Sequence, residues 1–271
     1  MPELPEVETT IRGLTPVLAG QRLTEVEPRR ADLRKAIPVD LRQRLTGATV
    51  TALGRRAKYG LIDTDRGDTL IFHLGMSGRW RVDPLEMQTH DHLLLTTVAG
   101  RRLALNDPRR FGFLDLLRTD ALDGYPPFVA LGPEPLGATL TGSYLRGILA
   151  GRTAPIKAML LDQRIVAGLG NIYVCEALHR ARIAPSRAAG QIALARLERL
   201  ADAIRAVLQE AIAAGGSTLR DFAHPDGALG YFSKQFRVYG REGRPCDCGG
   251  TVRRRVEAGR STFWCPRCQR V

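Results

Sequence analysis

Residues 152–187, RTAPIKAMLLDQRIVAGLGNIYVCEALHRARIAPSR, decide the fold of the second half of the chain. Apolar residues recur at helical spacing on both sides of GLGN, which predicts a helix, a tight turn and a second helix. Gly168 and Gly170 permit the sharp reversal, and Asn171 can cap the second helix. Amides at such a helix start suit an anion such as a DNA phosphate. A glycine turn between packed helices needs no ligand, so the motif alone does not establish an anion-binding site.

The last four cysteines predict a metal site. Cys246 and Cys248, in PCDCGG, are separated by sixteen residues from Cys265 and Cys268, in FWCPRCQ. Two such pairs form a closed tetrahedral zinc site, and the metal would supply the folding energy of so short a segment. The first pair is one residue tighter than C-x-x-C, so its turn must differ in shape. Four ordinary thiols are the alternative, and Cys175, within a predicted helix, is expected to be a buried, inert thiol.

The charge of the chain points to a polyanionic partner. Forty Lys and Arg residues stand against 28 Asp and Glu residues, which gives a net charge of +12. Residues 234–271 hold ten basic and three acidic side chains, a net +7. Nucleic acid or an acidic membrane surface are the candidate partners, and basic residues on a zinc-fixed ribbon favour phosphate binding over a merely solvated charge run.

No apolar run approaches the roughly 18 residues that a membrane-spanning helix needs. The first residues show neither the basic segment nor the apolar block of a secretory signal. We therefore expect a cytoplasmic protein without a membrane partner.

Outward from this helical stretch, the pattern predicts a β-rich lobe, a helical lobe and a small metal module. Near-alternating apolar residues broken by Gly or Asp predict strands at 49–64, 68–76, 92–98 and 101–107. The start of the chain, PEVETTIRGLTPVL, has helical spacing instead. The predicted segments are the β-rich lobe at 1–123, a Pro- and Gly-rich linker at 124–137, the helical lobe at 138–233 and the zinc module at 234–271.

Two turns of the β-rich lobe carry side chains suited to entering DNA. FHLGMSG contains Met76, and NDPRRFG contains Arg109 and Phe111. Apolar and Arg side chains on turns of a basic protein suggest wedges that fill the gap left by an extruded base. Met76 as a core residue and Phe111 as a hairpin anchor are the alternatives.

The first residues, MPELPEVETT, are suited to covalent chemistry. Removal of the initiator methionine would leave a free amine on Pro2, which titrates near pH 8, roughly two units below lysine. Attack of this amine on a sugar C1′ gives an iminium, which accepts electrons in eliminations. Glu3 and Glu6 could move protons. The alternative is that Pro2 and Pro5 only begin a helix whose dipole favours acidic residues.

Six motifs together carry a resemblance to a known family. PELPEVE, AKYG, FHLGMSG, NDPRRFG, GLGNIY and RSTFWCPRCQ occur in order along essentially the whole chain. The sequence resembles bacterial formamidopyrimidine-DNA glycosylases, which are 8-oxoguanine DNA glycosylases and AP lyases. The related endonuclease VIII branch typically begins PEGPE, so Leu4 favours the purine-lesion branch. The resemblance implies an α+β multidomain fold: an N-terminal β-sandwich lobe with flanking helices, a helical lobe with a helix–two-turn–helix motif, and a C-terminal zinc β-hairpin.

The resemblance also implies the catalytic residues. Pro2 would be the Schiff-base nucleophile, and Glu3 the acid that assists glycosidic cleavage. Lys58, in AKYG, would contact a phosphate and serve in β-elimination. Arg260, on the zinc hairpin, would serve in δ-elimination and grip a phosphate, although the short Cys246-x-Cys248 pair leaves its placement open.

Further residues would contact DNA bent in a cleft between the lobes. Asn171 would hold the backbone beside the lesion. Met76, Arg109 and Phe111 match the inserted triad, in which Arg109 reads the orphaned cytosine. His90, Arg109 and Arg152 match further contact positions, and the loop from Ser217 to Asp226 matches a segment that covers the flipped base.

The expected protein is therefore a monomeric, cytoplasmic enzyme, with nucleoid-associated activity, that acts on double-stranded DNA containing oxidised purines. It would hold one structural zinc and no redox or nucleotide cofactor. One alternative is an endonuclease VIII-like enzyme for oxidised pyrimidines. Another is a non-catalytic zinc-ribbon DNA-binding protein, against which Pro2, Glu3 and Lys58 argue, because binding alone does not need them.

Overall fold

Two four-stranded antiparallel sheets form the β-rich lobe in the computed structural model, which describes residues 2–217, 225–228, 230–257 and 259–270. Their strand orders are β1-β6-β7-β5 and β2-β3-β4-β8. The predicted strand segment at 49–64 divides at a turn into β2 and β3. The strands are β1 (Leu23–Pro28), β2 (Val50–Arg56), β3 (Tyr59–Thr64), β4 (Asp68–His73), β5 (Arg79–Val82), β6 (Asp91–Thr97), β7 (Arg102–Asn106) and β8 (Phe113–Arg118).

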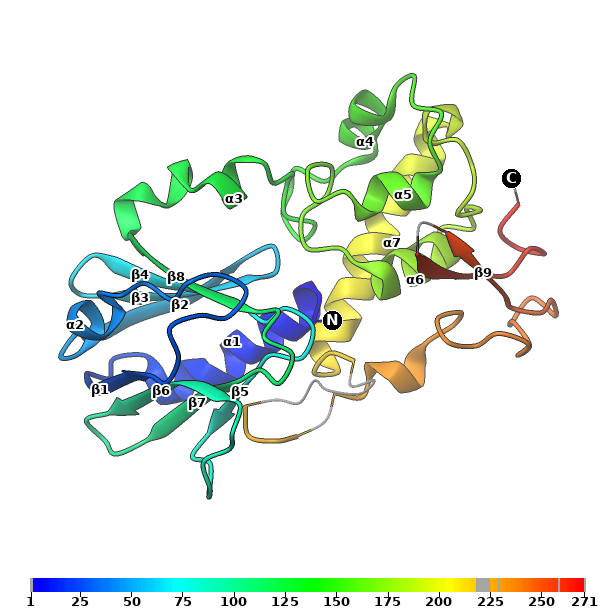
Figure 1. Cartoon of the computed structure of the whole chain (residues 1–271). Helices are drawn as coiled ribbons and strands as arrows, with labels where there is room; N and C mark the ends of the chain where they lie inside the picture. The colour runs from blue at the N-terminus through cyan, green and yellow to red at the C-terminus, as the bar shows by residue number, and fades with distance from the viewer. Residues whose placement is uncertain (1, 218–224, 229, 258, 271) are drawn as a thin grey trace. The chain divides into compact units, whose positions relative to one another are not determined.

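Helix α1 (Leu4–Leu18) shares one core with both sheets (Figure 1). Its buried face includes Val7, Ile11, Leu14 and Leu18, as its helical spacing predicts. These side chains join apolar residues from strands of both sheets in a single buried cluster. The lobe also contains α2 (Leu41–Leu45), a 3-10 turn η1 (Thr119–Gly124) and α3 (Pro126–Val129).

The predicted helix, turn and helix form around GLGN. Helix α5 (Ile156–Leu161) ends before the turn, and α6 (Asn171–Arg180) follows it. The N-cap of α6 is Gly170, whereas the sequence predicts Asn171 for this role. Asn171 is instead the first helical residue, and its side-chain amide donates to the Ser261 carbonyl of β10. The helical lobe also contains α4 (Gly142–Leu149), η2 (Ala189–Gln191) and the long α7 (Leu194–Ala213).

The C-terminal hairpin packs against α6. Its strands are β9 (Arg253–Glu257) and β10 (Arg260–Trp264), and a short turn η3 (Phe232–Gln235) precedes the segment. Cys175 of α6 lies in a buried cluster with Val238, Val252, Phe263 and the metal-binding cysteines. The predicted order of a β-rich lobe, a helical lobe and a zinc hairpin is thus confirmed.

The chain divides into two compact units, whose boundaries differ in part from those of the predicted segments. One comprises Met1–Val129 and Ala214–Ser233, and the other Ala130–Ala213 and Lys234–Val271. The first boundary falls inside the predicted linker at 124–137. Residues 214–233 belong to the first unit because Ser217 and Pro225 are hydrogen-bonded to Glu6 and Val82. In the described part of the chain, no helix is long and apolar enough to cross a membrane.

Candidate functional site

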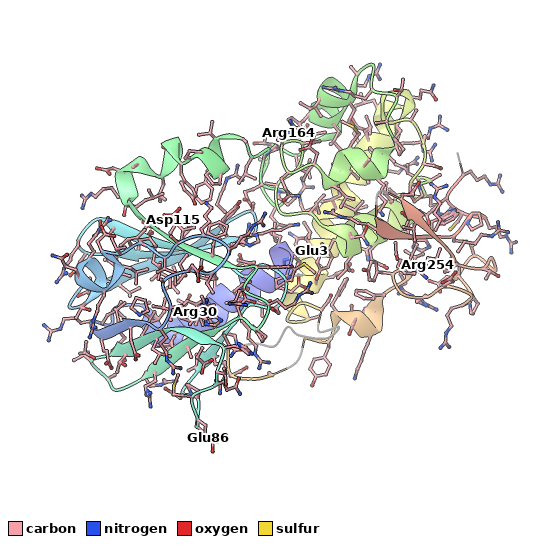
Figure 2. All side chains as sticks on the ribbon, in the orientation of Figure 1. Glu3, Arg30, Glu86, Asp115, Arg164 and Arg254 are labelled. Atoms are coloured by element: carbon pink, nitrogen blue, oxygen red, sulfur yellow. The ribbon has the colours of Figure 1, made fainter. Side chains whose placement is uncertain are left out.

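Two buried carboxylates organise the start of α1, where Figure 2 labels Glu3. Glu3 is the N-cap, and it forms a capping box with Glu6. Oε2 of Glu6 accepts the backbone N–H of Glu3 at 2.8 Å, and Oε1 accepts that of Ser217 at 2.8 Å. Glu3 and Glu6 are only 3% and 2% exposed, and Pro2 is buried as well. This geometry favours Glu6 as the residue that holds the backbone of Pro2 and Glu3, whereas its predicted proton transfer stays a prediction. The predicted removal of Met1 concerns a residue outside the described part of the chain.

Lys58 lies in the two-residue turn between β2 and β3. Its neighbour Ala57 has a φ of 51°, as such tight hairpin turns require. Helix α1 packs against both strands, so the hairpin that carries Lys58 rests on the helix that begins after Glu3. Lys58 is 8% exposed, which leaves its side chain largely shielded from water.

His73, at the end of β4, is held in its neutral form. Its Nδ1 accepts the N–H of Gly75 at 3.0 Å, and its ring stacks on Phe113 with the centroids 5.5 Å apart. Burial, together with the nearby charges of Lys58 and Arg34, lowers the pKa of His73 to about 4. A neutral His73 can accept the N–H that begins the turn carrying Met76.

This neutral histidine predicts a loss of stability in acid. The folded pKa of about 4 lies below the ordinary 6.5, so the unfolded chain takes up a proton first as pH falls. The contribution of the neutral His73 ring to the free energy of unfolding is fully present above pH 6.5. It declines by about 1.4 kcal/mol per pH unit down to pH 4, or about 3 kcal/mol in all. His73→Asn keeps an acceptor but does not titrate. The free energy of unfolding, measured with urea from pH 7 to 4, should decline less steeply for this variant than for wild type. The exposed control His90→Asn should follow the wild-type curve. Parallel curves for wild type and His73→Asn would contradict the assignment.

Asp107 joins the two turns that carry the predicted wedges. Its Oδ1 accepts the hydroxyl of Ser77 at 2.6 Å, and its Oδ2 accepts the N–H of Gly112 at 2.8 Å. The Ser77 oxygen in turn accepts the N–H of Arg109 at 3.2 Å. At Gly75, where φ is 59°, an added Cβ would lie 2.3 Å from the nitrogen of Gly112. The two turns therefore touch backbone to backbone, and only glycine fits there.

This arrangement brings the predicted triad to neighbouring turns. The Arg109 guanidinium lies over the ring of Phe111, 4.9 Å from its centroid. Phe111 is 47% exposed, although large aromatic side chains are usually buried. Met76 is partly exposed, and His90 lies exposed before β6. An exposed Phe beside an Arg is suited to a partner with flat, stackable surfaces.

In the second unit, the start of α6 is hydrogen-bonded to the start of β10. Asn171 Nδ2 donates to the carbonyl of Ser261 at 2.9 Å. Lys157 Nζ donates to Thr262 Oγ1 at 2.7 Å and to the Ser261 carbonyl at 3.3 Å. Lys157 is buried, which lowers its pKa. The two residues that follow Arg260 in β10 are thus connected to two helices of the same unit.

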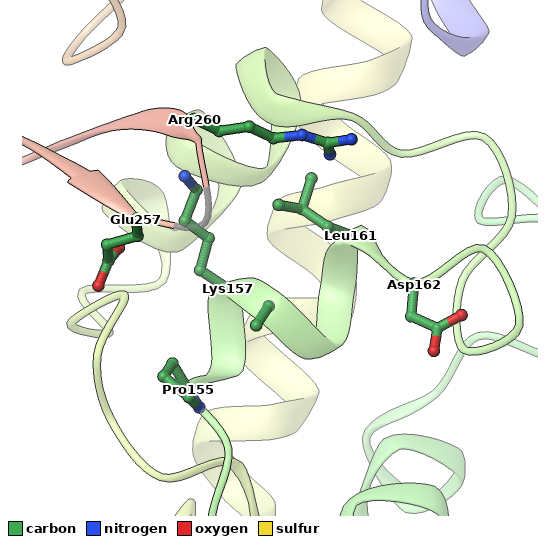
Figure 3. Close-up of a pocket in the computed structure, with 7 residues that line it drawn as sticks. Pro155, Lys157, Leu161, Asp162, Glu257 and Arg260 are labelled. Atoms are coloured by element: carbon green, nitrogen blue, oxygen red, sulfur yellow. The ribbon is translucent and has the colours of Figure 1, made fainter.

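Arg260 lines a pocket of about 590 Å³ with residues of α5 (Figure 3). In the close-up, the Lys157 side chain extends from α5 toward the hairpin, and the Arg260 guanidinium lies above Leu161. Asp162 and Glu257 also line this pocket. The structure therefore brings Arg260 and Asn171 to the same end of β10. Arg152 lies exposed after α4, and among the described contacts none joins it to this strand.

The four predicted metal ligands converge in the second unit. The sulfurs of Cys246, Cys248, Cys265 and Cys268 all lie within 4.8 Å of one another. The distance is 3.9 Å from Cys246 to Cys268 and 3.5 Å from Cys248 to Cys265. Tetrahedral zinc with Zn–S bonds of about 2.3 Å needs sulfurs about 3.8 Å apart, so the set fits. Four thiolates leave no open position, and the metal would hold the hairpin folded.

Family models match three consecutive parts of the chain. Residues 1–114 match the formamidopyrimidine-DNA glycosylase N-terminal domain, 131–223 the H2TH domain of the same family, and 245–271 a zinc finger found in FPG and IleRS. A formamidopyrimidine-DNA glycosylase of Rhizorhabdus wittichii is 71% identical over 270 residues, with all of both chains covered. The chain belongs to the formamidopyrimidine-DNA glycosylase family. The Novosphingobium aromaticivorans enzyme of the same name is 64% identical over 270 residues, again covering both chains.

Solved structures of formamidopyrimidine-DNA glycosylases share the fold. A Lactococcus lactis Fpg mutant in complex with Fapy-dG-containing DNA has a TM-score of 0.92, at 35% identity and with full coverage of both chains. The MutM (Fpg) protein of Thermus thermophilus has a TM-score of 0.89 at 43% identity, covering 99% of this chain and 98% of its own. The predicted family is confirmed, and these comparisons support neither the endonuclease VIII-like nor the non-catalytic alternative.

Several residues that build the formamidopyrimidine-DNA glycosylase site were not predicted. Asp107 and Ser77 fix the wedge-bearing turns, and Lys157 fixes the hairpin. An Asp before Pro at a turn was the available signal for Asp107, but a partner 30 residues away, such as Ser77, leaves no local pattern. The predicted base-covering loop from Ser217 to Asp226 lies largely outside the described residues.

Proposed function

We propose that this protein excises oxidised purines, 8-oxoguanine and formamidopyrimidines, from double-stranded DNA and cleaves the strand at the abasic site. One observation of the structure carries the proposal: Glu6 anchors the backbone of Glu3 and Ser217, so that a buried carboxylate stands beside Pro2. Relatives named for this activity match the chain over its full length. Their solved counterparts include complexes with lesion-containing DNA.

The chemistry begins at Pro2 once Met1 is removed. The Pro2 nitrogen bonds to C1′ as the bond from C1′ to the base breaks, and the protonated Glu3 carboxyl gives its proton to the departing base. The amine proton is lost, and opening of the sugar ring at O4′, which takes up a proton, leaves a C1′ iminium. Glu3 is 3% exposed, so bulk water is largely excluded from its carboxyl group.

The iminium drives two eliminations. Removal of a C2′ proton sends electrons toward C1′ and breaks the C3′–O bond, with Lys58 serving this β step. In the second elimination, removal of a C4′ proton breaks the C5′–O bond and releases the phosphate on the 5′ side, with Arg260 serving this δ step. Water hydrolyses the remaining imine and frees the amine. Each step conserves electrons, so none of them requires an oxidant or a reductant.

The remaining residues hold the DNA. Met76, Arg109 and Phe111 fill the space of the extruded base, and the Arg109 donors face the unpaired cytosine. Asn171 holds the backbone beside the lesion, and His90 and Arg152 make further contacts with the DNA. The zinc keeps the hairpin in place, and the enzyme works as a monomer at the nucleoid.

A substrate panel tests the proposal. The full-length protein is incubated with borohydride and duplexes containing 8-oxoguanine opposite cytosine, thymine glycol, or no lesion. With borohydride we expect a covalent complex on the 8-oxoguanine duplex, and in a parallel incubation without borohydride we expect a one-nucleotide gap. Both products should be much less abundant with the other two duplexes. Peptide mass spectrometry should locate the adduct on Pro2. Preference for thymine glycol would favour the pyrimidine branch, and binding without any adduct would refute catalysis.

A further inference from the structure

His179 contacts a zinc ligand from helix α6. It lies in the last turn of the helix, and its Nε2 is 3.3 Å from the sulfur of Cys246. Cys246 is 6% exposed, and the imidazole is itself partly buried. A ring nitrogen at this distance from a sulfur is within the range of an N–H···S hydrogen bond.

The imidazole approaches the metal site from outside. Among the described residues, the cluster whose ligand atoms all lie within 4.8 Å of one another contains the four cysteines and no histidine. Four thiolates on Zn²⁺ carry a net charge of −2, so each sulfur is a strong acceptor. Donors that contact ligand atoms orient the ligands and tune the metal. His179 is placed to be such a donor and not a fifth ligand.

The short first cysteine pair provides fewer backbone donors of its own, which makes a donor from another segment useful. Between Cys246 and Cys248 there is one residue, so the turn has one backbone N–H fewer to direct at the sulfurs than a C-x-x-C turn. The turn is closed by Gly249, whose N–H donates to the Cys246 carbonyl at 2.8 Å with a φ of 77°. His179 offers the Cys246 sulfur a donor from outside this turn.

Independent contacts hold the end of α6 against the zinc segment. Gln269 Nε2 donates to the Ile183 carbonyl at 2.9 Å, and Gln269 Oε1 accepts the N–H of Cys265 at 2.8 Å. Glu176, one turn before His179, accepts the N–H groups of residues 237–239 at 2.8–3.0 Å. The histidine is therefore positioned by the packing of the unit and does not depend on the contact with Cys246.

We propose that His179 is a positioning residue of the zinc centre, whose Nε2–H donates to the metal-bound thiolate of Cys246 and slows the release of zinc. The neutral ring protonated on Nε2 is sufficient for this role. The inference concerns metal retention and stands whether or not the protein cleaves DNA.

The test measures zinc release from the full-length zinc-loaded protein to an excess of a chromogenic chelator. His179→Phe keeps a planar side chain without a donor, and His179→Gln restores an N–H donor at similar reach. Loss of an outer contact to a metal ligand typically lowers metal affinity by about 10- to 100-fold. We therefore expect roughly tenfold faster release from His179→Phe, near-wild-type release from His179→Gln, and no effect from exposed His90→Phe.

Cobalt and cadmium provide readouts that a purely structural role would not change. The cobalt-loaded wild type should show the absorption of four thiolates, and His179→Phe should keep four thiolates with a shifted sulfur-to-metal charge-transfer band. A three-thiolate, one-imidazole spectrum in wild type would overturn the proposal in favour of direct ligation, and equal zinc release from wild type and His179→Phe would also overturn it. If His179→Phe does not fold, scalar coupling between the His179 Nε2 proton and ¹¹³Cd in wild type decides: its presence supports the bond, and its absence refutes it.

Discussion

Glu3→Gln is expected to abolish base excision while sparing strand cleavage at a preformed abasic site. Glutamine has nearly the size of glutamate, so the 3%-exposed position tolerates it sterically, but it cannot give a proton to the departing base. General acid catalysis contributes roughly 10²- to 10⁴-fold, and we expect a loss in this range for 8-oxoguanine excision. An abasic duplex has already lost its base, so the imine at Pro2 can form without that proton. Single-turnover rates on the two duplexes measure the contrast.

The control for this variant lies one turn further along the same helix. Glu8 is partly exposed and pairs with Arg12 and Arg55 at 3.0 and 3.2 Å. Glu8→Gln removes a carboxylate from α1 without touching the capping box, and we expect at most a small change in both rates. An equal loss on the 8-oxoguanine and abasic duplexes in Glu3→Gln would mean that Glu3 holds the backbone of Pro2 instead of donating a proton. Thermal melting of both variants separates misfolding from either outcome.

The local patterns of the chain predicted much of this site. The apolar spacing of α1, the turn around GLGN and the cysteine pairs each depend on residues within a few positions of one another, and each is found as predicted. The motif resemblance selected Pro2, Glu3 and Lys58, and the structure places Glu3 and Lys58 on elements that pack together.

Local sequence patterns could not predict contacts between distant segments. The carboxylate of Glu6 is bonded to Ser217, 211 residues further along the chain, which moves residues 214–233 into the first unit. Asn171 was predicted to cap α6, but its amide is bonded to Ser261, 90 residues away. A polar side chain with several donors or acceptors takes whichever partner the tertiary fold brings near. The sequence therefore identified Glu6 and Asn171, but not the distant partners that their side chains contact.

Loss of zinc is expected to weaken DNA binding by about 100-fold. Cys265 is fully buried, and the cluster around it is small, so the folding of residues 245–271 depends on the metal. Without it, the hairpin no longer presents Arg260 and its basic neighbours. Two charge-assisted phosphate contacts at about 1.5 kcal/mol each account for this loss, since 1.4 kcal/mol is tenfold in affinity. Cys265→Ala should lack zinc, bind an abasic-site analogue about 100-fold more weakly and show a shallower dependence on salt, because fewer counterions are released.

The fifth cysteine supplies the matched control. Cys175 is as buried as Cys265 and belongs to the same apolar cluster, but its sulfur is not among the four that converge. Cys175→Ala should therefore keep one zinc per chain by elemental analysis and bind DNA nearly as wild type does, at some cost in stability from the small cavity. If Cys265→Ala also kept its DNA affinity and salt dependence, the hairpin would not contribute phosphate contacts, and Arg260 could not serve the second elimination. If both variants lost affinity equally, packing against α6, and not the metal, would be what presents the hairpin to DNA.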